Sequence, residues 1–142
     1  MIYARPKIII SKCLEFDSCR YDGQIINNKY IRLMKEHIDF FPVCPEVEIG
    51  MGIPRDPVHL VYNNKKMSMI QSSTNINFFD KMNKFSDQYL SKVSEVDGFI
   101  LKSRSPSCGV NSTKIYPKIT KKTSPLKKGS GIFTLKVKEF FP

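Results

Sequence analysis

The sequence predicts an α/β domain: a Rossmann-like open, mostly parallel sheet with helices on both faces and a small β-hairpin. Three observations lead to this prediction. A chain of 142 residues is long enough for one hydrophobic core but not for two, so residues 1–142 are expected to form a single domain. Three short apolar runs resemble strands buried in parallel sheets. Segments of helical periodicity alternate with these runs, as is typical of α/β folds.

The first half of the chain predicts two strands, a helix and a hairpin. Lys7–Ser11 is a short apolar run of the kind buried in parallel sheets, and residues 28–37 place apolar side chains at roughly helical spacing. Phe40–Val43 is the second apolar run. After a loop rich in glycine and proline, two further strand-like runs flank the polar turn Asn63–Lys65, which favours a hairpin over residues 58–70.

The second half predicts the longest helix and the third buried strand. Apolar residues recur at steps of mostly three and four over residues 75–96, and Thr74 or Asn75 could cap this helix. Gly98–Leu101 is the third apolar strand. The remaining expected elements are a short strand at 114–118, a polar loop at 121–131 and a terminal helix at 133–141.

Three cysteines follow the predicted parallel strands. Cys13 and Cys44 come directly after the first two strands, and Cys108 comes one short loop after the third. Parallel strands end together, and ligands of open α/β sheets bind in the crevice beyond the carboxyl ends of the strands. We therefore expect these three thiols to meet at one edge of the sheet, although they lie far apart in the sequence.

The cysteine spacing favours some metal centres over others. Structural zinc usually takes close cysteine pairs, whereas the closest pair here, Cys13 and Cys19, has five residues between its members. Thiolates from distant loops can hold an iron–sulfur cluster, and a cuboidal cluster with three protein ligands leaves one iron open as a Lewis acid for soft sulfur. Zinc stays an alternative, and Cys19 could be a fourth ligand, a thiol relay or a residue without a role.

Several polar residues near these cysteines are candidates for chemistry. Glu46 lies two residues past the second cysteine, across a proline, where a carboxylate could transfer protons; alone, it could equally be an ordinary loop acid. Ser103, Ser105 and Ser107 precede the third cysteine, and their hydroxyls could orient a water or a substrate carbonyl, or satisfy turn backbone groups.

The positive charge of the chain is concentrated in one segment. Residues 98–138 contain ten Lys and Arg and no acidic residue, and the remaining 13 basic residues balance the 13 acidic ones. Such a segment attracts phosphate or nucleic acid, or forms a solvated basic surface. Within it, Gly129-Ser130-Gly131 precedes a predicted helix and is a candidate phosphate nest, supported by Lys127 and Lys128.

Five blocks of the sequence resemble the thiouracil desulfidase (TudS) family. They occur in the family's order and extend from Lys7 to Phe133. The blocks are Cys13-Leu14 with Cys19-Arg20-Tyr21-Asp22-Gly23; Pro42-Val43-Cys44-Pro45-Glu46; Gly50-x-Gly52-x-Pro54-Arg55; Asp97-Gly98-Phe99-Ile100-Leu101-Lys102 with Ser105-Pro106-Ser107-Cys108-Gly109; and Gly129-x-Gly131-x-Phe133.

The resemblance implies an oxygen-sensitive 4Fe–4S cluster with three protein ligands, matching Cys13, Cys44 and Cys108, and one open iron. It also implies non-redox desulfidation, in which 4-thio-UMP or thiouracil becomes UMP or uracil plus sulfide. The thione sulfur would bind the open iron while water attacks the ring carbon. Glu46 matches the proton carrier, and Ser105 is the serine expected to help hold the substrate.

Two alternative functions stay open, and the sequence differs from the usual family pattern in two respects. The same chemistry could act on thiolated tRNA, or the chain could be a non-enzymatic metal-binding or cluster-carrying module. Cys13 is followed by residues 14–17, Leu-Glu-Phe-Asp, where relatives commonly have Leu-Leu-Gly. Family members also occur fused to a second domain, so either the chain is a stand-alone enzyme or a C-terminal partner domain is missing.

The expected location is the cytoplasm. No apolar run approaches the roughly 20 residues that cross a bilayer, so no membrane partner is expected, and the first residues lack a secretory signal. In that compartment, four cysteines are expected to be ligands or catalysts rather than disulfides. The expected partner is a small thiolated nucleobase or nucleotide, and the sequence carries no signal for an oligomeric state.

Overall fold

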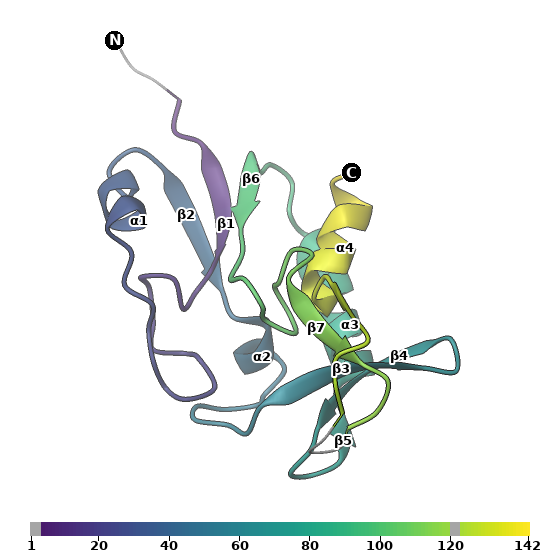
Figure 1. Cartoon of the computed structure of the whole chain (residues 1–142). Helices are drawn as coiled ribbons and strands as arrows, with labels where there is room; N and C mark the ends of the chain where they lie inside the picture. Colours follow the sequence, from purple (N-terminus) through teal and green to yellow (C-terminus); the bar gives the residue numbers. More distant parts are fainter. Residues whose placement is uncertain (1–3, 120–122) are drawn as a thin grey trace.

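The computed structural model describes residues 4–119 and 123–142 and confirms the α/β class (Figure 1). Two sheets and four helices make up these ranges. The helices are α1 (Lys29–Met34), α2 (Pro45–Glu48), α3 (Phe79–Ser91) and α4 (Ile132–Phe140). None of them is long and apolar enough to cross a membrane. Part of the polar loop expected at residues 121–131 lies outside the described ranges.

The three predicted apolar strands form one parallel sheet. Strand β1 (Lys7–Ser11) is central, between β2 (Asp39–Val43) and β6 (Gly98–Ile100), in the order β2-β1-β6. Pro42 pairs with Ile10 from the edge strand β2. This position suits proline because an edge strand has a side on which no backbone N–H is needed for pairing. The carboxyl ends of the three strands therefore lie at one edge, as predicted.

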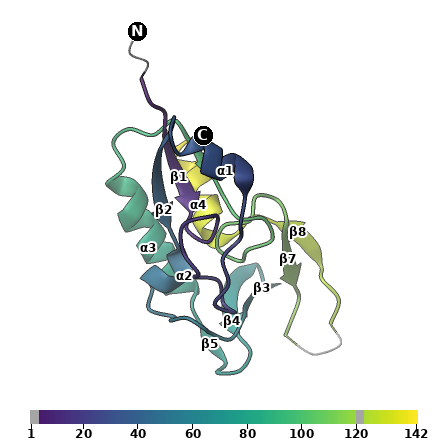
Figure 2. The ribbon, with the colours of Figure 1, turned by 90° about the vertical axis from the view of Figure 1, so that its left-hand side faces the viewer.

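Helices cover both faces of this parallel sheet (Figure 2). Successive side chains of a strand point to opposite faces. Ile9 accordingly packs in a buried cluster with Leu90 of α3 and Phe133 of α4, whereas Ile10 packs in another cluster with Ile31 of α1. The doubly covered sheet explains why the central strand is a continuous apolar run rather than an alternating one.

The predicted hairpin is confirmed, but it belongs to a larger, second sheet. The sheet consists of β5 (Ile76–Asn77), β4 (Lys66–Gln71), β3 (Val58–Asn63), β7 (Thr113–Tyr116) and β8 (Lys127–Gly129), in that spatial order. Only β3 and β7 pair in parallel. Leu60 and Met69 pack against Met82 of α3 and Ile132 of α4, so these two helices contact both sheets.

The longest helix begins later than predicted, at Phe79 rather than near Asn75. Asn75 adopts a positive φ of 59°, and Ile76–Asn77 pairs with the end of β4 as strand β5. The expected cap was therefore wrong. The N-cap residue is Phe78, which makes no side-chain capping bond. The side-chain oxygen of Asn77, one residue earlier, accepts hydrogen bonds from the backbone N–H groups of Phe79 and Met69, each at 3.0 Å, and so joins the start of the helix to β4.

Candidate functional site

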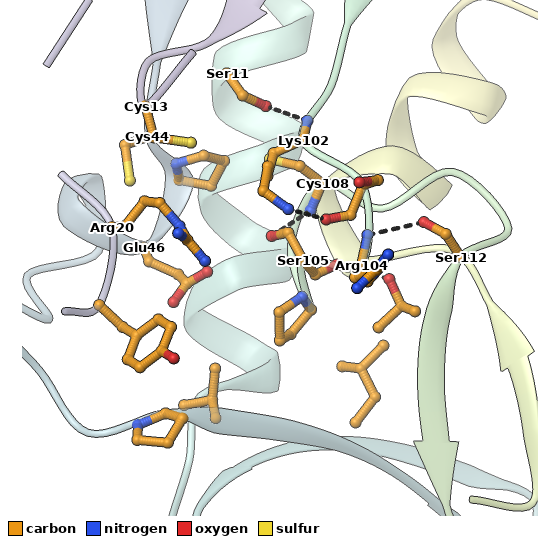
Figure 3. A pocket seen from close by; sticks show the side chains of 18 of the residues that line it. Ser11, Cys13, Arg20, Cys44, Glu46, Lys102, Arg104, Ser105, Cys108 and Ser112 are labelled. Atoms are coloured by element: carbon orange, nitrogen blue, oxygen red, sulfur yellow. Dashed lines mark hydrogen bonds between the residues drawn. The ribbon is translucent and has the colours of Figure 1, made fainter. Parts of the chain in front are cut away.

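A cavity of about 650 Å³ opens beyond the carboxyl ends of the parallel strands, where the first sheet faces the second (Figure 3). The turn after β1, the loop around Cys19, the start of α2 and the loop from β6 to β7 line it. Strands β3, β7 and β8 supply the opposite wall. The cavity thus lies where the sequence predicted that strand ends would assemble a site.

All four cysteines line this cavity, and all four carry free thiols. Cys13 follows β1 in a turn, and Cys44 immediately precedes α2, with Pro45 as the first helical residue. The two side chains approach one another in Figure 3. Cys19 joins them although it lies further along the loop after β1 rather than at the end of a strand. The structure therefore brings together Cys13, Cys44 and Cys108 as predicted, and adds Cys19.

Hydrogen bonds among the thiols differentiate their acidities. A hydrogen bond from Cys19 lowers the pKa of Cys13, and the same bond raises the pKa of Cys19 to about 11. The hydrogen bond between Cys44 and Cys19, followed by burial, raises the pKa of Cys44. Burial raises the pKa of Cys108 to about 12, opposed by side-chain hydrogen bonds from Ser11 and Ser105. Cys13 is therefore the thiol that most readily becomes a thiolate.

The N-terminus of α4 holds the loop that carries Cys108. Backbone N–H groups of Gly131, Ile132 and Thr134 donate to loop carbonyl oxygens at 2.8, 3.0 and 3.2 Å, respectively. The Thr134 hydroxyl also donates to the Cys108 carbonyl at 2.8 Å. The first N–H groups of a helix have no partner within the helix, so the loop satisfies them while α4 fixes the position of the third cysteine.

The Glu46 carboxylate lies at the cavity with both oxygens occupied. Its Oε1 accepts a hydrogen bond from the Arg55 Nε at 3.2 Å, and its Oε2 accepts one from the Ser107 hydroxyl at 3.0 Å. The side chain is 13% exposed and that of Arg55 5% exposed. Glu46 lies in the first turn of α2 rather than in a plain turn, because Pro45 suits the first helical position and fixes its own φ there.

The three serines predicted near Cys108 have different environments. Ser103 and Ser105 line the cavity, whereas Ser107 is 1% exposed and serves Glu46 instead. The Ser105 hydroxyl oxygen accepts the backbone N–H groups of Ser107 and Cys108, each at 3.1 Å. Ser105 therefore satisfies turn backbone groups and also lines the cavity, and its expected role towards a substrate or a water stays a prediction.

The structure does not bring the predicted phosphate nest to the cavity. The Gly131 N–H already donates to the Gly109 carbonyl, and the Ser130 hydroxyl bonds Asn111. Gly129, in β8, pairs with Thr113 of β7, and the Lys127 ammonium lies 5.0 Å from the Tyr62 ring centroid. Of this group, Lys128 alone lines the cavity.

Other cations line the cavity instead: two belong to the basic segment at residues 98–138 without having been singled out there, and the third lies outside that segment. Figure 3 shows Arg20, Lys102 and Arg104 around the cavity. Burial lowers the pKa of Lys102, and the nearby charges of Arg20 and Arg104 act in the same direction. No ion pair joins these three to a carboxylate within the described residues. Arg20, Lys102 and Arg55 do lie in the sequence blocks that resemble the desulfidase family. That resemblance was the signal in the sequence that could have identified them.

The donor set at the cavity fits an iron–sulfur cluster. In the ranges that the structure describes, no three or more His, Cys, Asp and Glu side chains are arranged to hold one metal ion. A cuboidal cluster does not require its thiolates to converge on one atom, because each binds a separate iron. Four free thiols from separate loops at one cavity provide the sulfur ligands that such a cluster needs.

Comparisons with known proteins extend over nearly the whole chain. A family model described as 2-thiouracil desulfurase matches residues 8–142. The uncharacterized protein YbbK of Bacillus subtilis (strain 168) is 27% identical over 143 residues, which cover 93% of this chain and 89% of that protein. Among solved structures, the 4Fe-4S-dependent thiouracil desulfidase TudS matches with a TM-score of 0.70 and 25% identity, over 95% of this chain and 86% of that chain.

Proposed function

The chain belongs to the 2-thiouracil desulfurase family, and we propose that it removes sulfur from thiolated uracil compounds without net oxidation or reduction. The observation that carries the proposal is one cavity lined by four free thiols and the Glu46 carboxylate. The proposed substrates are thiouracil and 4-thio-UMP. In the overall reaction, water replaces the thione sulfur, so that C=S and H₂O become C=O and H₂S.

We propose that Cys13, Cys44 and Cys108 hold a 4Fe–4S cluster. The similarity to TudS, a 4Fe-4S-dependent enzyme, and the thiol-lined cavity support this assignment. When bound, a cluster with three protein ligands supplies one open iron, a Lewis acid suited to soft sulfur. Cys19 is then left as a thiol that hydrogen-bonds the proposed ligand Cys13.

Glu46 is the proposed proton carrier. Its carboxylate lies at the cavity and accepts hydrogen bonds from Arg55 and Ser107. We propose that it accepts a proton from the attacking water and returns a proton to the departing sulfur. The Ser105 hydroxyl, also at the cavity, would orient the substrate carbonyl or the water. Proton transfer by a positioned side chain typically contributes about 10²–10⁴-fold to a rate.

The cations of the cavity suit a substrate that carries phosphate. Arg20, Lys102, Arg104 and Lys128 line the same cavity as the thiols, and none of them forms an ion pair with a carboxylate of the residues that the structure describes. Like charges collected in this way attract an anion. We propose that the 5′-phosphate of 4-thio-UMP binds among them, in place of the glycine nest expected from the sequence. Thiouracil lacks this phosphate and would bind more weakly.

The test is an anaerobic sulfide-release assay with the cluster-reconstituted protein. Sulfide and UMP should form in equal amounts from 4-thio-UMP, and KM should be lower for 4-thio-UMP than for thiouracil. Thiolated tRNA serves as a competing substrate in the same assay. A reconstituted protein that holds about four irons but releases no sulfide from either small substrate would refute the proposal.

A further inference from the structure

The Glu46 carboxylate is held by two contacts that come from different parts of the chain. Arg55 approaches one oxygen from the loop before β3, and Ser107 approaches the other from the loop after β6. Both partners are removed from solvent, with a 5% exposed side chain for Arg55 and a 1% exposed residue for Ser107. Neither oxygen can rotate without breaking one of these bonds.

Arg55 is itself fixed at several points. Its Nη1 donates to the carbonyl oxygens of Cys19 at 3.0 Å and Gly52 at 2.9 Å. Its backbone N–H donates to the Tyr21 carbonyl at 2.8 Å. The planar guanidinium is a rigid fork, so these bonds define the direction in which its Nε meets Glu46. An arginine held this firmly is suited to setting the orientation of its partner rather than to following a mobile ligand.

We propose that Arg55 and Ser107 are positioning residues, which act on the reaction by holding the Glu46 carboxylate towards the cavity. The inference rests on the proposed role of Glu46 as the proton carrier. A carboxylate freed from both contacts samples several rotamers, and a displacement of about 1 Å at a reacting group can cost on the order of 10²-fold in rate. The same arginine lines the cavity, so direct contact with the substrate phosphate is the competing role.

The experiment compares Arg55→Met, Arg55→Lys and Ser107→Ala, each alone and combined with Glu46→Gln. We expect Arg55→Met to lower kcat between about 10- and 100-fold, equally for thiouracil and 4-thio-UMP, with KM and iron content unchanged. Arg55→Lys should recover part of kcat. In the Glu46→Gln background, neither Arg55→Met nor Ser107→Ala should lower kcat further by more than about twofold, because the group they position no longer acts.

A matched control is Arg5→Met, because Arg5 also pairs with a carboxylate, that of Asp39 at 2.8 Å, and also bonds backbone carbonyls, but far from the cavity. It should leave kcat unchanged. A KM increase confined to 4-thio-UMP in Arg55→Met would assign Arg55 to phosphate binding and overturn the inference. Further loss in the Glu46→Gln background, or loss of iron, would also overturn it. Full activity of Glu46→Gln alone would instead reject the proposed role of Glu46.

Discussion

Replacing Gly131 with alanine tests how α4 supports the loop of Cys108. A Cβ atom at this position would lie 2.3 Å from the Ser107 carbonyl carbon, 2.4 Å from its oxygen and 2.7 Å from the Cys108 nitrogen. All three are backbone atoms, so neither side can avoid the clash by rotating a side chain. The loop and the helix must separate by more than 1 Å to restore ordinary contact.

The expected cost follows from the contacts that such a separation weakens. Overpacking of this kind costs about 1–3 kcal/mol. The four hydrogen bonds between the start of α4 and the loop contribute on the order of 1 kcal/mol each, and we expect some of them to be lost. The total of about 2–5 kcal/mol corresponds to a fall in Tm of roughly 5–15 °C for a chain of this size. The displaced Cys108 should also bind iron poorly.

Two measurements check this prediction: the Tm of the apo-protein by circular dichroism, and the iron bound per chain after anaerobic reconstitution. Gly98→Ala is the matched control, because its Cβ would meet only the end of the Ile8 side chain, at 3.4 Å. This control should change the unfolding free energy by less than about 1 kcal/mol and retain iron. The reasoning is refuted if Gly131→Ala keeps both the wild-type Tm and the wild-type iron content.

Three further predictions concern the cavity. Alanine at any one of the three proposed ligands should abolish the iron-dependent visible absorption, whereas Cys19→Ala should retain it; equal loss in all four would make Cys19 a ligand. Arg104→Met and Lys102→Met should raise KM for 4-thio-UMP about 10-fold and leave KM for thiouracil unchanged, measured by sulfide release; equal effects on both substrates would exclude a phosphate contact. Burial lowers the pKa of His59 below 6.5, and its Nδ1 is buried with no hydrogen-bond partner among the described residues. The unfolded chain therefore binds this proton first as the pH falls, so stability should decrease below about pH 6.5, and His59→Leu should flatten this part of a Tm–pH curve.

The sequence predicted the parts of the site that depend on local rules. Apolar runs of four or five residues identified the parallel strands. Parallel pairing places the carboxyl ends of these strands at one edge of the sheet, regardless of the length and conformation of the loops between them. The sequence alone therefore assigns Cys13 and Cys44 to one edge of the sheet. Glu46 followed from its distance to Cys44, because two residues across a proline leave little freedom.

The remaining parts of the site depend on contacts between distant segments. Arg55 lies nine residues after Glu46, and no periodicity in the sequence predicts that their side chains meet. Only the structure shows the bonds of Arg55 to Glu46 and to the Cys19 carbonyl. Strand β8 was missed because three residues, Lys-Lys-Gly, carry no alternation of apolar and polar side chains.

The glycines before α4 show how one motif can have two physical explanations. A glycine at a helix N-terminus allows either an anion or a backbone to approach the free N–H groups, and the sequence does not distinguish the two. Here the approaching group is the backbone of the Cys108 loop, whose carbonyls take the N–H groups that a phosphate would need. Gly131 therefore supports the position of the loop that carries the third cysteine, and the proposed phosphate site is left to basic side chains that line the cavity. Helix α4, which contributes no lining residue to the cavity, is thus as necessary for assembling the thiol site as the strands that precede it.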